Sequence, residues 1–541
     1  MNVRVTLAAL ACALLCITGC SKQTAGSAAG GRNPWTQPGV VRLGEPDEPD
    51  NINPMFGHTS ATDEVDGLIF AFLLRYDADG NYIPDLATQV PTTKNGGISA
   101  DGKTIIVHLR SGARWSDGAP LTAKDWIFTY HAVLNPANNT KTRFGWDDIA
   151  GASAPNDTTI VIHLKRADAS FLGTLAMGSS AYPPLPAHLL AALPNLNTAS
   201  FNNAPISSGP YILQRWNHGS SLTFVPNPYY FRGAPKLKQI VWRVIPDPNT
   251  QFSQLQTHEI DVYPGVSENE IPRLHEVTGI RVMQKLVANW RHLGFNTSKP
   301  LLADVRVRRA ITEAVDWKRL IDTVYHGYDR PAVSDVYPES WAAPKLPPYR
   351  YDPRDAAALL HAAGWRRGPS GVLMRDGKAL RLTLSTGTGN MENALAEVVI
   401  QSMLKAVGID VRIRNYPVSL LFAQNGPIYS GAYDMEWSVA TNGPDPDNSG
   451  SWNGAFIPPK GANTAWLNDP LVNRLSEEAL RTNDRAKRKA LYQREEERLR
   501  ELYVQVAVYW ENKYTAVNTD MQNYEPAAFI ADTWNSWQWK I

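Results

Sequence analysis

Two carboxylates in the segment GPDPDN, residues 443–448, have a spacing that could bind a cation. Asp445 and Asp447 alternate with proline, and alternating carboxylates supply the hard oxygen ligands that Ca²⁺ prefers. An EF-hand loop, however, spreads its ligands over a longer stretch and closes with a bidentate glutamate, which this segment lacks. Three interpretations stay open: a calcium site, a structural turn rich in proline and aspartate, and a loop that faces an organic ligand.

Motifs of common catalytic centres are missing from the sequence. It contains no HExxH zinc motif, no GxSxG nucleophile elbow, no P-loop and no GxGxxG loop, and its 11 histidines lack the spacing of metal ligands. The 17 tryptophans and paired carboxylates make an exported glycan hydrolase an alternative, but no pair stands out as the two carboxylates that flank a scissile glycosidic bond. We expect a binding protein rather than an enzyme, with no metal and no cofactor.

All three cysteines of the chain, Cys12, Cys16 and Cys20, lie near its beginning. The apolar run over residues 6–17 is too short to span a bilayer, which takes about 20 apolar residues, and is typical of a secretory signal peptide. The sequence ITGC, which ends at Cys20, resembles the bacterial lipobox. That resemblance implies a signal peptide over residues 1–19 and lipid attachment at Cys20; the alternative is an ordinary signal peptide with a chance cysteine.

The segment after Cys20 and the overall charge indicate where the body of the protein is found. Residues 20–34 are small and polar, which predicts a flexible tether. Cleavage before Cys20 removes Arg4 alone, so Lys+Arg falls from 53 to 52 and equals the 52 Asp+Glu. A neutral body argues against nucleic acid as a partner. We expect an exported, soluble body that its anchor holds at the cell envelope, in the periplasm or on the outer face of the membrane.

Alternation of apolar and polar residues predicts the strands that must position a site. Residues 104–110 and 158–165 alternate in this way after turn signals, so we expect two strands of one small sheet. A capping-box pattern at Thr122 and Asp125 predicts a helix that runs to about Leu134.

Residues 380–413 predict a strand, a helix and a second strand, which form a right-handed parallel βαβ unit. Gly408 can take the left-handed conformation that ends the helix. We expect the helix to bury an apolar face formed by Leu395, Val398, Val399, Met403, Ala406 and Val407.

Asp352 and Asp469, each followed by proline, predict the starts of two further helices. The densely charged residues 484–502 predict another helix with i,i+4 ion pairs. We expect this helix to be a solvated surface element rather than a docking site.

Eight segments, taken in order, carry a resemblance that covers nearly the whole chain after residue 34. They read LRYDADGNYIPDLATQVPT, DGKTIIVHLRSGARWSDGAPLTAKDWIFTYHAVLNP, PISSGPYIL, VPNPYYFRGAPKLKQIVWRVIPDPNT, HEIDVYPGV, LGFNTSKPLLADVRVRRAITEAVDWKRLI, YDPRDAAALLHAAGW and YDMEWSVATNGPDPDN. With these segments the chain resembles the family 5 extracellular solute-binding proteins of bacterial ABC importers, the dipeptide- and oligopeptide-binding proteins.

The resemblance implies an α/β fold of the periplasmic-binding-protein type II, with two lobes around a hinged cleft and an additional small α+β domain. It assigns residues 35–68, 205–288 and 508–541 to the N-terminal main lobe, 69–204 to the small domain, and 289–507 to the second main lobe. The chain is expected to cross between the lobes near 289–296 and 506–514, where alternation predicts strands.

The same resemblance implies the lipid-anchored substrate-binding component of an ABC transporter. A peptide would be captured by closure of the two lobes, and the monomeric protein would deliver it to the permease subunits of an importer that also contains ATPase subunits. Ligands other than peptides occur in this family: nickel chelates, haem, glutathione, opines and oligosaccharides. The residues that the resemblance places at the ligand are Tyr263, Gly265, Trp290, His292, Trp437, Asn442, Asp445 and Tyr509.

Two features keep alternatives open at this site. Each aromatic residue among these could pack in the core instead of facing the cleft. In the peptide-binding relatives an aspartate shortly before the Asp/Glu-Pro pair of the loop holds the α-ammonium of the ligand, and counting back from DPDN puts Asn442 at that position. The loop is one residue shorter than in the dipeptide binders, so the count can slip, and Asp445 or Asp434 can substitute.

Overall fold

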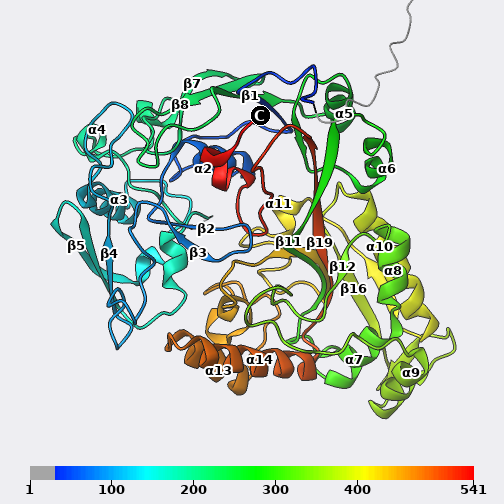
Figure 1. Cartoon of the computed structure of the whole chain (residues 1–541). Helices are drawn as coiled ribbons and strands as arrows, with labels where there is room; N and C mark the ends of the chain where they lie inside the picture. The colour runs from blue at the N-terminus through cyan, green and yellow to red at the C-terminus, as the bar shows by residue number, and fades with distance from the viewer. Residues whose placement is uncertain (1–30, 179) are drawn as a thin grey trace, which may run out of the picture.

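The computed structural model describes residues 31–178 and 180–541 (Figure 1). The expected signal peptide and Cys20 lie outside the described residues. Asn33, within the expected tether, is tied to the body: its backbone N–H donates to Asp520 Oδ2 at 2.8 Å and its side-chain amide donates to Asn518 Oδ1 at 2.9 Å. The body therefore includes the last residues of the segment that the sequence assigned to the tether.

A large mixed sheet runs through the molecule and is flanked by helices (Figure 1). Its strand order is β17 (Asp410–Ile413), β16 (Arg381–Ser385), β18 (Met435–Thr441), β11 (Ile280–Phe295), β19 (Gln505–Asn518), β10 (Val262–Pro264), β1 (Val40–Glu45), β9 (Gln239–Val244), β8 (Ser221–Pro226) and β7 (Tyr211–Asn217), with β12 (Arg330–Pro331) beside β19. We call β17, β16 and β18 the second half of the sheet, and β10, β1, β9, β8 and β7 the first half. The expected α/β fold class is confirmed.

The antiparallel strands β11 and β19 join the two halves of the sheet (Figure 1). β18 pairs with residues 289–295 of β11, whereas β10 pairs with residues 515–517 of β19. The register between β11 and β19 shifts between Leu286 and Trp290, midway between these two pairings. Both segments expected to cross between lobes are therefore parts of long paired strands; bending at this point stays a prediction.

The βαβ unit forms as expected, because β16 and β17 are parallel and flank α10 (Met391–Ala406). Gly408 follows the helix with a φ of +90°, a left-handed conformation that glycine adopts without strain. The expected buried face of α10 is confirmed in part: Val407 is buried, and Val399 and Met403 pack against the core, but Leu395 and Val398 are each 52% exposed. The buried residues within the helix are Asn393, Ala396, Glu397, Ile400 and Leu404.

Glu397 shows how α10 buries a polar residue. Its Oε2 accepts a 2.6 Å hydrogen bond from Asn415 Nδ2, and burial raises the pKa of Glu397 to about 7. The shift keeps much of this carboxyl neutral near pH 7, which lowers the cost of burying it.

The remaining helices of the second half include the two that begin at aspartate–proline pairs. They are α7 (Val305–Ala314), α8 (Trp317–Val324), α9 (Pro353–Ala362), α11 (Val418–Leu421), α12 (Ser449–Trp452), α13 (Pro470–Leu480) and α14 (Arg485–Leu502). Asp352 and Asp469 cap α9 and α13 by accepting backbone N–H bonds, as expected. A small sheet of β13 (Arg366–Arg367), β14 (Leu373–Arg375) and β15 (Lys378–Ala379) packs nearby.

The expectation that α14 is a solvated surface helix is wrong for its inner face. Arg488, Glu495 and Glu496 on this helix are buried. Glu496 Oε1 accepts a 2.9 Å bond from Asn448 Nδ2, and burial raises the pKa of both glutamates well above its usual range. Burial therefore disfavours the charged form of both glutamates, and this burial cannot be predicted from the number of charged residues in the segment.

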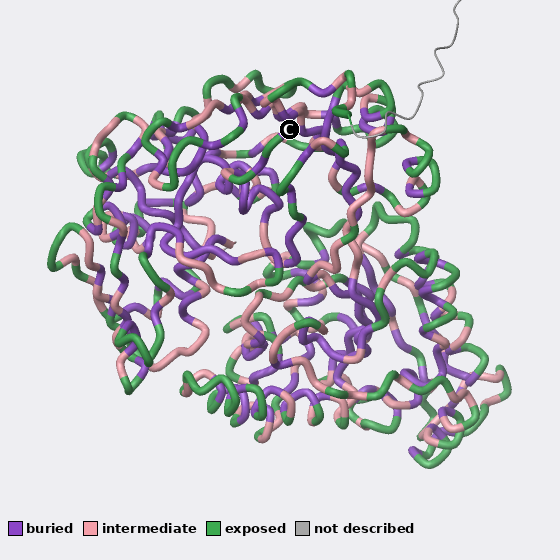
Figure 2. The backbone as a smooth tube through the Cα atoms, viewed as in Figure 1, coloured by how far each residue is buried: buried purple, intermediate pink, exposed green. Residues whose placement is uncertain are grey.

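A small sheet with the order β4 (Thr104–His108), β6 (Thr159–Leu164), β5 (Ile149–Asn156) lies to one side of the large sheet, with α3 (Ala123–Leu134) beside it (Figure 1). The two look-alike strands pair antiparallel, and Thr122 and Asp125 form the expected capping box. Figure 2 shows buried segments both here and in the first half of the large sheet, and one core cluster includes residues of both. This cluster contains the fully buried Trp115, Trp126 and Trp146.

A buried ion pair joins the two arms of the hairpin formed by β2 (Leu74–Tyr76) and β3 (Tyr82–Pro84), which follows α2 (Ser60–Ile69) along the chain. Arg75 and Asp85 have no exposed side-chain surface, and Arg75 Nε lies 2.6 Å from Asp85 Oδ2. The same Asp85 oxygen accepts the backbone N–H of Phe72 at 2.9 Å. α4 (Ala187–Leu190) packs against α3, whereas α5 (Pro248–Gln256) packs against β10 and α6 (Ile271–Leu274) against β11.

None of the helices within residues 31–178 and 180–541 combines the length and the apolar character needed to cross a membrane.

Candidate functional site

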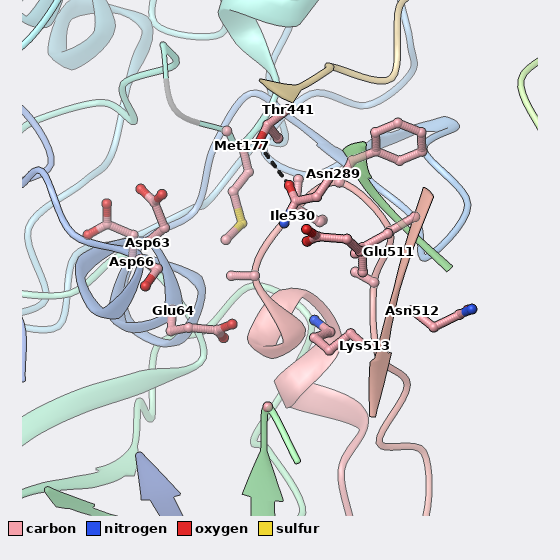
Figure 3. Close-up of a pocket in the computed structure, with 18 of the residues that line it drawn as sticks. Asp63, Glu64, Asp66, Met177, Asn289, Thr441, Glu511, Asn512, Lys513 and Ile530 are labelled. Carbon is pink, nitrogen blue, oxygen red and sulfur yellow. Dashed lines mark hydrogen bonds between the residues drawn. The ribbon is translucent and has the colours of Figure 1, made fainter. Parts of the chain in front are cut away.

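A cavity of about 610 Å³ lies where β11 and β19 cross between the halves of the sheet. This volume is within the range of roughly 300–1,000 Å³ typical of small-molecule sites. Its walls come from α2, from the middle of β11 and β19, from the end of β18 and from the C-terminal segment 527–531 (Figure 3). Segments far apart in the sequence therefore meet around one space, as a ligand site between two lobes requires.

The α2 wall of the cavity carries three carboxylates, Asp63, Glu64 and Asp66 (Figure 3). The helix begins after Thr59, whose side chain accepts the backbone N–H of Thr62. Asp63 and Asp66 are three residues apart, so they lie one above the other on the same helix face. Asp66 is only 3% exposed, and its Oδ1 has no hydrogen-bond partner among the residues that the structure describes. Burial raises the pKa of Asp66 well above its usual range and also raises the pKa of Asp63.

Glu64 points the other way along the wall, toward Lys513 (Figure 3). Its two carboxylate oxygens accept the backbone N–H groups of Asp532 and Thr533 at 2.9 and 3.1 Å. Lys513 Nζ lies 2.5 Å from Asp532 Oδ1. Burial and the neighbouring Asp532 raise the pKa of Glu64 to about 7. Glu64 thus links α2 to the C-terminal segment. Because each of its carboxylate oxygens already accepts a hydrogen bond, it is less available to a ligand than Asp63 or Asp66.

The opposite wall is formed by Glu511, Asn289 and Thr441. The Glu511 carboxylate points into the space that faces α2 (Figure 3), and one of its oxygens lies 3.2 Å from Arg291 Nη2. Thr441 Oγ1 donates a 2.8 Å hydrogen bond to Asn289 Oδ1. This wall offers hydroxyl and amide groups from β18 and β11, and a single carboxylate already paired with an arginine.

Two of the residues expected at the ligand lie at or next to this cavity. Gly265 lines it with a φ of +67°, which favours glycine. Asn442 lies behind it: Asn442 Oδ1 accepts a 3.0 Å bond from Trp290 Nε1, and its side-chain amide donates to the backbone carbonyl of Asp335. The residue of this loop that lines the cavity is Thr441, one position earlier. The role of Asn442 at the ligand, and its alternatives Asp445 and Asp434, stay predictions.

Asp445 and Asp447 are engaged within the protein. Arg488 Nη1 and Nη2 lie 3.0 and 2.6 Å from the two carboxylate oxygens of Asp445. Asp447 accepts the backbone N–H and the hydroxyl of Ser449, each at 3.2 Å. The turn interpretation of GPDPDN fits this geometry. Among the residues that the structure describes, no group of three or more His, Cys, Asp or Glu side chains is placed to hold a metal ion.

The other aromatic candidates are buried away from the large cavity. Trp437 and Tyr509 are in the core of the second half of the sheet, at 0% and 1% exposure. Tyr263 is also buried, and its hydroxyl donates to Glu270 Oε2 at 2.9 Å. His292 lines a smaller cavity of about 160 Å³. A role of any of these residues in ligand binding stays a prediction.

The carboxylates of α2 and the polar stretch Glu511-Asn512-Lys513 were missed by the sequence reasoning. A signal was present: SATDEVDG places three acids immediately before GLIFAFLL, a strongly apolar run. Acids that adjoin such a run must be partly buried, and buried acids often mark functional sites. The stretch at Glu511 interrupts an otherwise apolar strand in the same way.

Comparison with known proteins agrees with this architecture. A family model described as bacterial extracellular solute-binding proteins, family 5 Middle, matches residues 81–457. The oligopeptide-binding protein AppA of Bacillus subtilis (strain 168) is 28% identical over 514 residues, covering 93% of this chain and 92% of that protein. The nickel-binding periplasmic protein of Escherichia coli (strain K12) is 30% identical, covering 84% of this chain and 87% of that protein.

Solved structures show the same fold. AppA from Bacillus subtilis in complex with a nonapeptide is similar with a TM-score of 0.75 and 25% identity, covering 93% of this chain and 99% of that one. NikZ from Campylobacter jejuni in complex with Ni(L-His) is similar with a TM-score of 0.76 and 25% identity, covering 94% and 100%. The chain belongs to the bacterial extracellular solute-binding proteins of family 5, the substrate-binding proteins of ABC transporters.

Proposed function

We propose that this protein is the lipid-anchored, monomeric peptide receptor of an ABC importer. It captures a peptide by closure of two lobes and delivers it to membrane permease subunits, with ATPase subunits driving the transport. Cys20 holds it at the cell envelope. Members of this family are transport proteins, so the cavity has to bind and release a ligand and does not have to convert it chemically.

The observation that carries this proposal is the position of the cavity. Its walls come from β18 in the second half of the sheet and from α2 on the side of the first half, and both meet at the shifted register of β11 and β19. A ligand that contacts both walls favours the closed arrangement by its difference in affinity for the two states. Bending near Leu286 and Trp290 then opens and closes the cavity.

A peptide is the favoured ligand because AppA, which is named as an oligopeptide-binding protein, aligns with 93% of this chain. The cavity also offers Thr441, Asn289 and Asn512, whose hydroxyl and amide groups can hydrogen-bond a peptide main chain. Nickel complexes are the second candidate, since a nickel-binding protein and a Ni(L-His) complex are similarly close.

Closure predicts two changes that occur together on binding. A ligand at 100 times its Kd should raise the free energy of unfolding by about 2.7 kcal/mol by mass action, and should reduce the radius of gyration. Native mass spectrometry of the purified protein identifies a retained ligand, and small-angle scattering with denaturant unfolding measures both effects. A ligand that stabilises the protein without compacting it argues against closure.

The anchor gives an independent prediction. Cys20→Ala should move the protein from the membrane fraction to the soluble fraction of the cell envelope without lowering its melting temperature, because the described body starts well after Cys20 and includes Asn33. Cell fractionation and thermal unfolding of the variant and the wild type measure this. Retention of the variant in the membrane fraction would show that Cys20 is not the anchor.

A further inference from the structure

We propose that Asp63 and Asp66 on α2 form the subsite for a positively charged group of the ligand, an ammonium or a guanidinium. The inference rests on the proposed function only in placing the ligand in this cavity. An ammonium can come from the N-terminus of a peptide or from a lysine side chain, and the test below separates these sources.

Asp66 is the best evidence, because it combines two features: it lines the cavity, and one of its oxygens lacks a hydrogen-bond partner among the described residues. Other buried acids, Glu495 among them, also have such an oxygen but do not line the cavity, and several are paired with a cation. Asp85 pairs with Arg75 at 2.6 Å, Asp261 pairs with Arg42 at 2.8 Å, and Asp532 pairs with Lys513 at 2.5 Å. Asp66 is also only 3% exposed. A buried carboxylate without a partner is costly, and a cation bound in the cavity removes that cost.

The surrounding charges favour a cation over an anion. Asp63 stands one helical turn before Asp66 and has only a long contact with Lys141, whose Nζ lies 3.8 Å away. Lys513 also lines the cavity but is neutralised by Asp532. Glu511 faces α2 from the opposite wall (Figure 3). The cavity therefore combines one paired lysine with carboxylates on both sides.

This placement also accounts for the missing acid on the other wall. The resemblance to peptide-binding relatives leads one to expect an aspartate in the loop after β18. At this point Thr441, the last residue of β18, lines the cavity, and the side chain of Asn442 bonds to Trp290 instead. The carboxylates of the cavity that form no ion pair with an arginine lie instead on α2. A positive group of the ligand is then held on the α2 side of the cavity.

Binding of a cation is expected to release a proton. Asp63 on α2, Arg75 from β2 and Lys141 from the loop after α3 are the charged groups around Asp66, and its pKa in the free protein is raised mainly by burial. A cation lowers that pKa, so the proton leaves on binding and affinity for cationic ligands falls as the pH falls. A neutral ligand shows no such proton release from Asp66.

The test uses the full mature protein and four pools of random tetrapeptides. The pools carry either a free or an acetylated N-terminus, and either lysine or norleucine at one randomised position; spermidine serves as a non-peptide cation. Affinities and proton release are measured by calorimetry in buffers of different ionisation enthalpy. The wild type should bind at least one cationic pool about 10–100-fold more tightly than the acetylated norleucine pool, and the pool that gains identifies which ammonium is bound.

Asp66→Asn should abolish this preference and the proton release, so that the variant binds the cationic and neutral pools with equal affinity. The asparagine side chain resembles the protonated acid in shape, so folding is preserved; Asp63→Asn should have a smaller effect of the same sign. Asp157→Asn is the matched control, because Asp157 is 65% exposed and pairs with Lys124 away from the cavity.

The outcomes separate this inference from the proposed function. If the wild type binds the neutral pool as tightly as the cationic ones, or if Asp66→Asn keeps the preference, the inference is wrong and the peptide function stands. Binding of spermidine alone, lost in Asp66→Asn, keeps the inference and contradicts the peptide function. Binding of none of the probes contradicts both.

Discussion

Asp85→Ala is expected to lower the free energy of unfolding by about 3–5 kcal/mol, the range for removing one partner of a buried ion pair. Arg75 is fully buried, and without Asp85 its guanidinium loses its anionic partner. It keeps hydrogen bonds to Met177 Sδ and to the backbone carbonyls of Phe70 and Trp534, and its contacts with the rings of Phe72 and Trp537. The backbone N–H of Phe72 also loses its acceptor. Denaturant unfolding of the variant and the wild type measures the difference.

Two further variants show whether the loss of stability comes from leaving the charge of Arg75 unpaired. Asp157→Ala removes an exposed carboxylate and should change stability by no more than about 0.5 kcal/mol. The double variant Arg75→Met/Asp85→Leu removes both charges and should be clearly more stable than Asp85→Ala. A double variant as unstable as the single one would show that hydrogen bonds to the backbone, rather than the charge, dominate this contact.

Asp445→Asn is expected to lower the free energy of unfolding by about 3 kcal/mol and to leave ligand affinity unchanged. Asp445 holds Arg488 through two short contacts, and the two side chains are only 16% and 8% exposed. The variant leaves Arg488, on the inner face of α14, without a negatively charged partner. Chemical denaturation and calorimetry, the latter well below the melting temperature, measure stability and affinity separately.

Arg488→Met provides the matched change on the other side of this pair. It should destabilise to a similar degree, and the double variant should lose less than the sum of the two, because the residues are in contact. A stable Asp445→Asn protein that no longer binds ligand would place Asp445 at the ligand instead and would overturn the structural role.

Local sequence patterns predicted elements well where the pattern itself causes the structure. The strands around α10 follow from alternation and from Gly408, and the capping box at Thr122 starts α3. The predicted inward face of α10 was wrong at Leu395 and Val398, which are exposed, and it missed Glu397, which is buried. Which face turns inward depends on neighbours such as Asn415, which lie elsewhere in the sequence.

The candidate site was harder to predict for the same reason. Asn442 and Asp445 were chosen from one loop, but their side chains are engaged by Trp290 and Arg488 from distant segments. Asp66 faces the cavity only because the chain from β18 and β19 returns to α2. Sequence alone located the loop beside the cavity, whereas the free carboxylates depend on the packing of segments hundreds of residues apart.

The place of β19 in the sheet has a consequence for how the molecule is assembled. β19 is the last strand along the chain, yet it lies between β11 and β10. Until residues 505–518 are available, the chain can form only two partial sheets, each with an unpaired edge. Such edges invite pairing with other chains, and pairings between distant segments form slowly. The chain therefore stays vulnerable to aggregation through the edges of β11 and β10 until its final strand is in place.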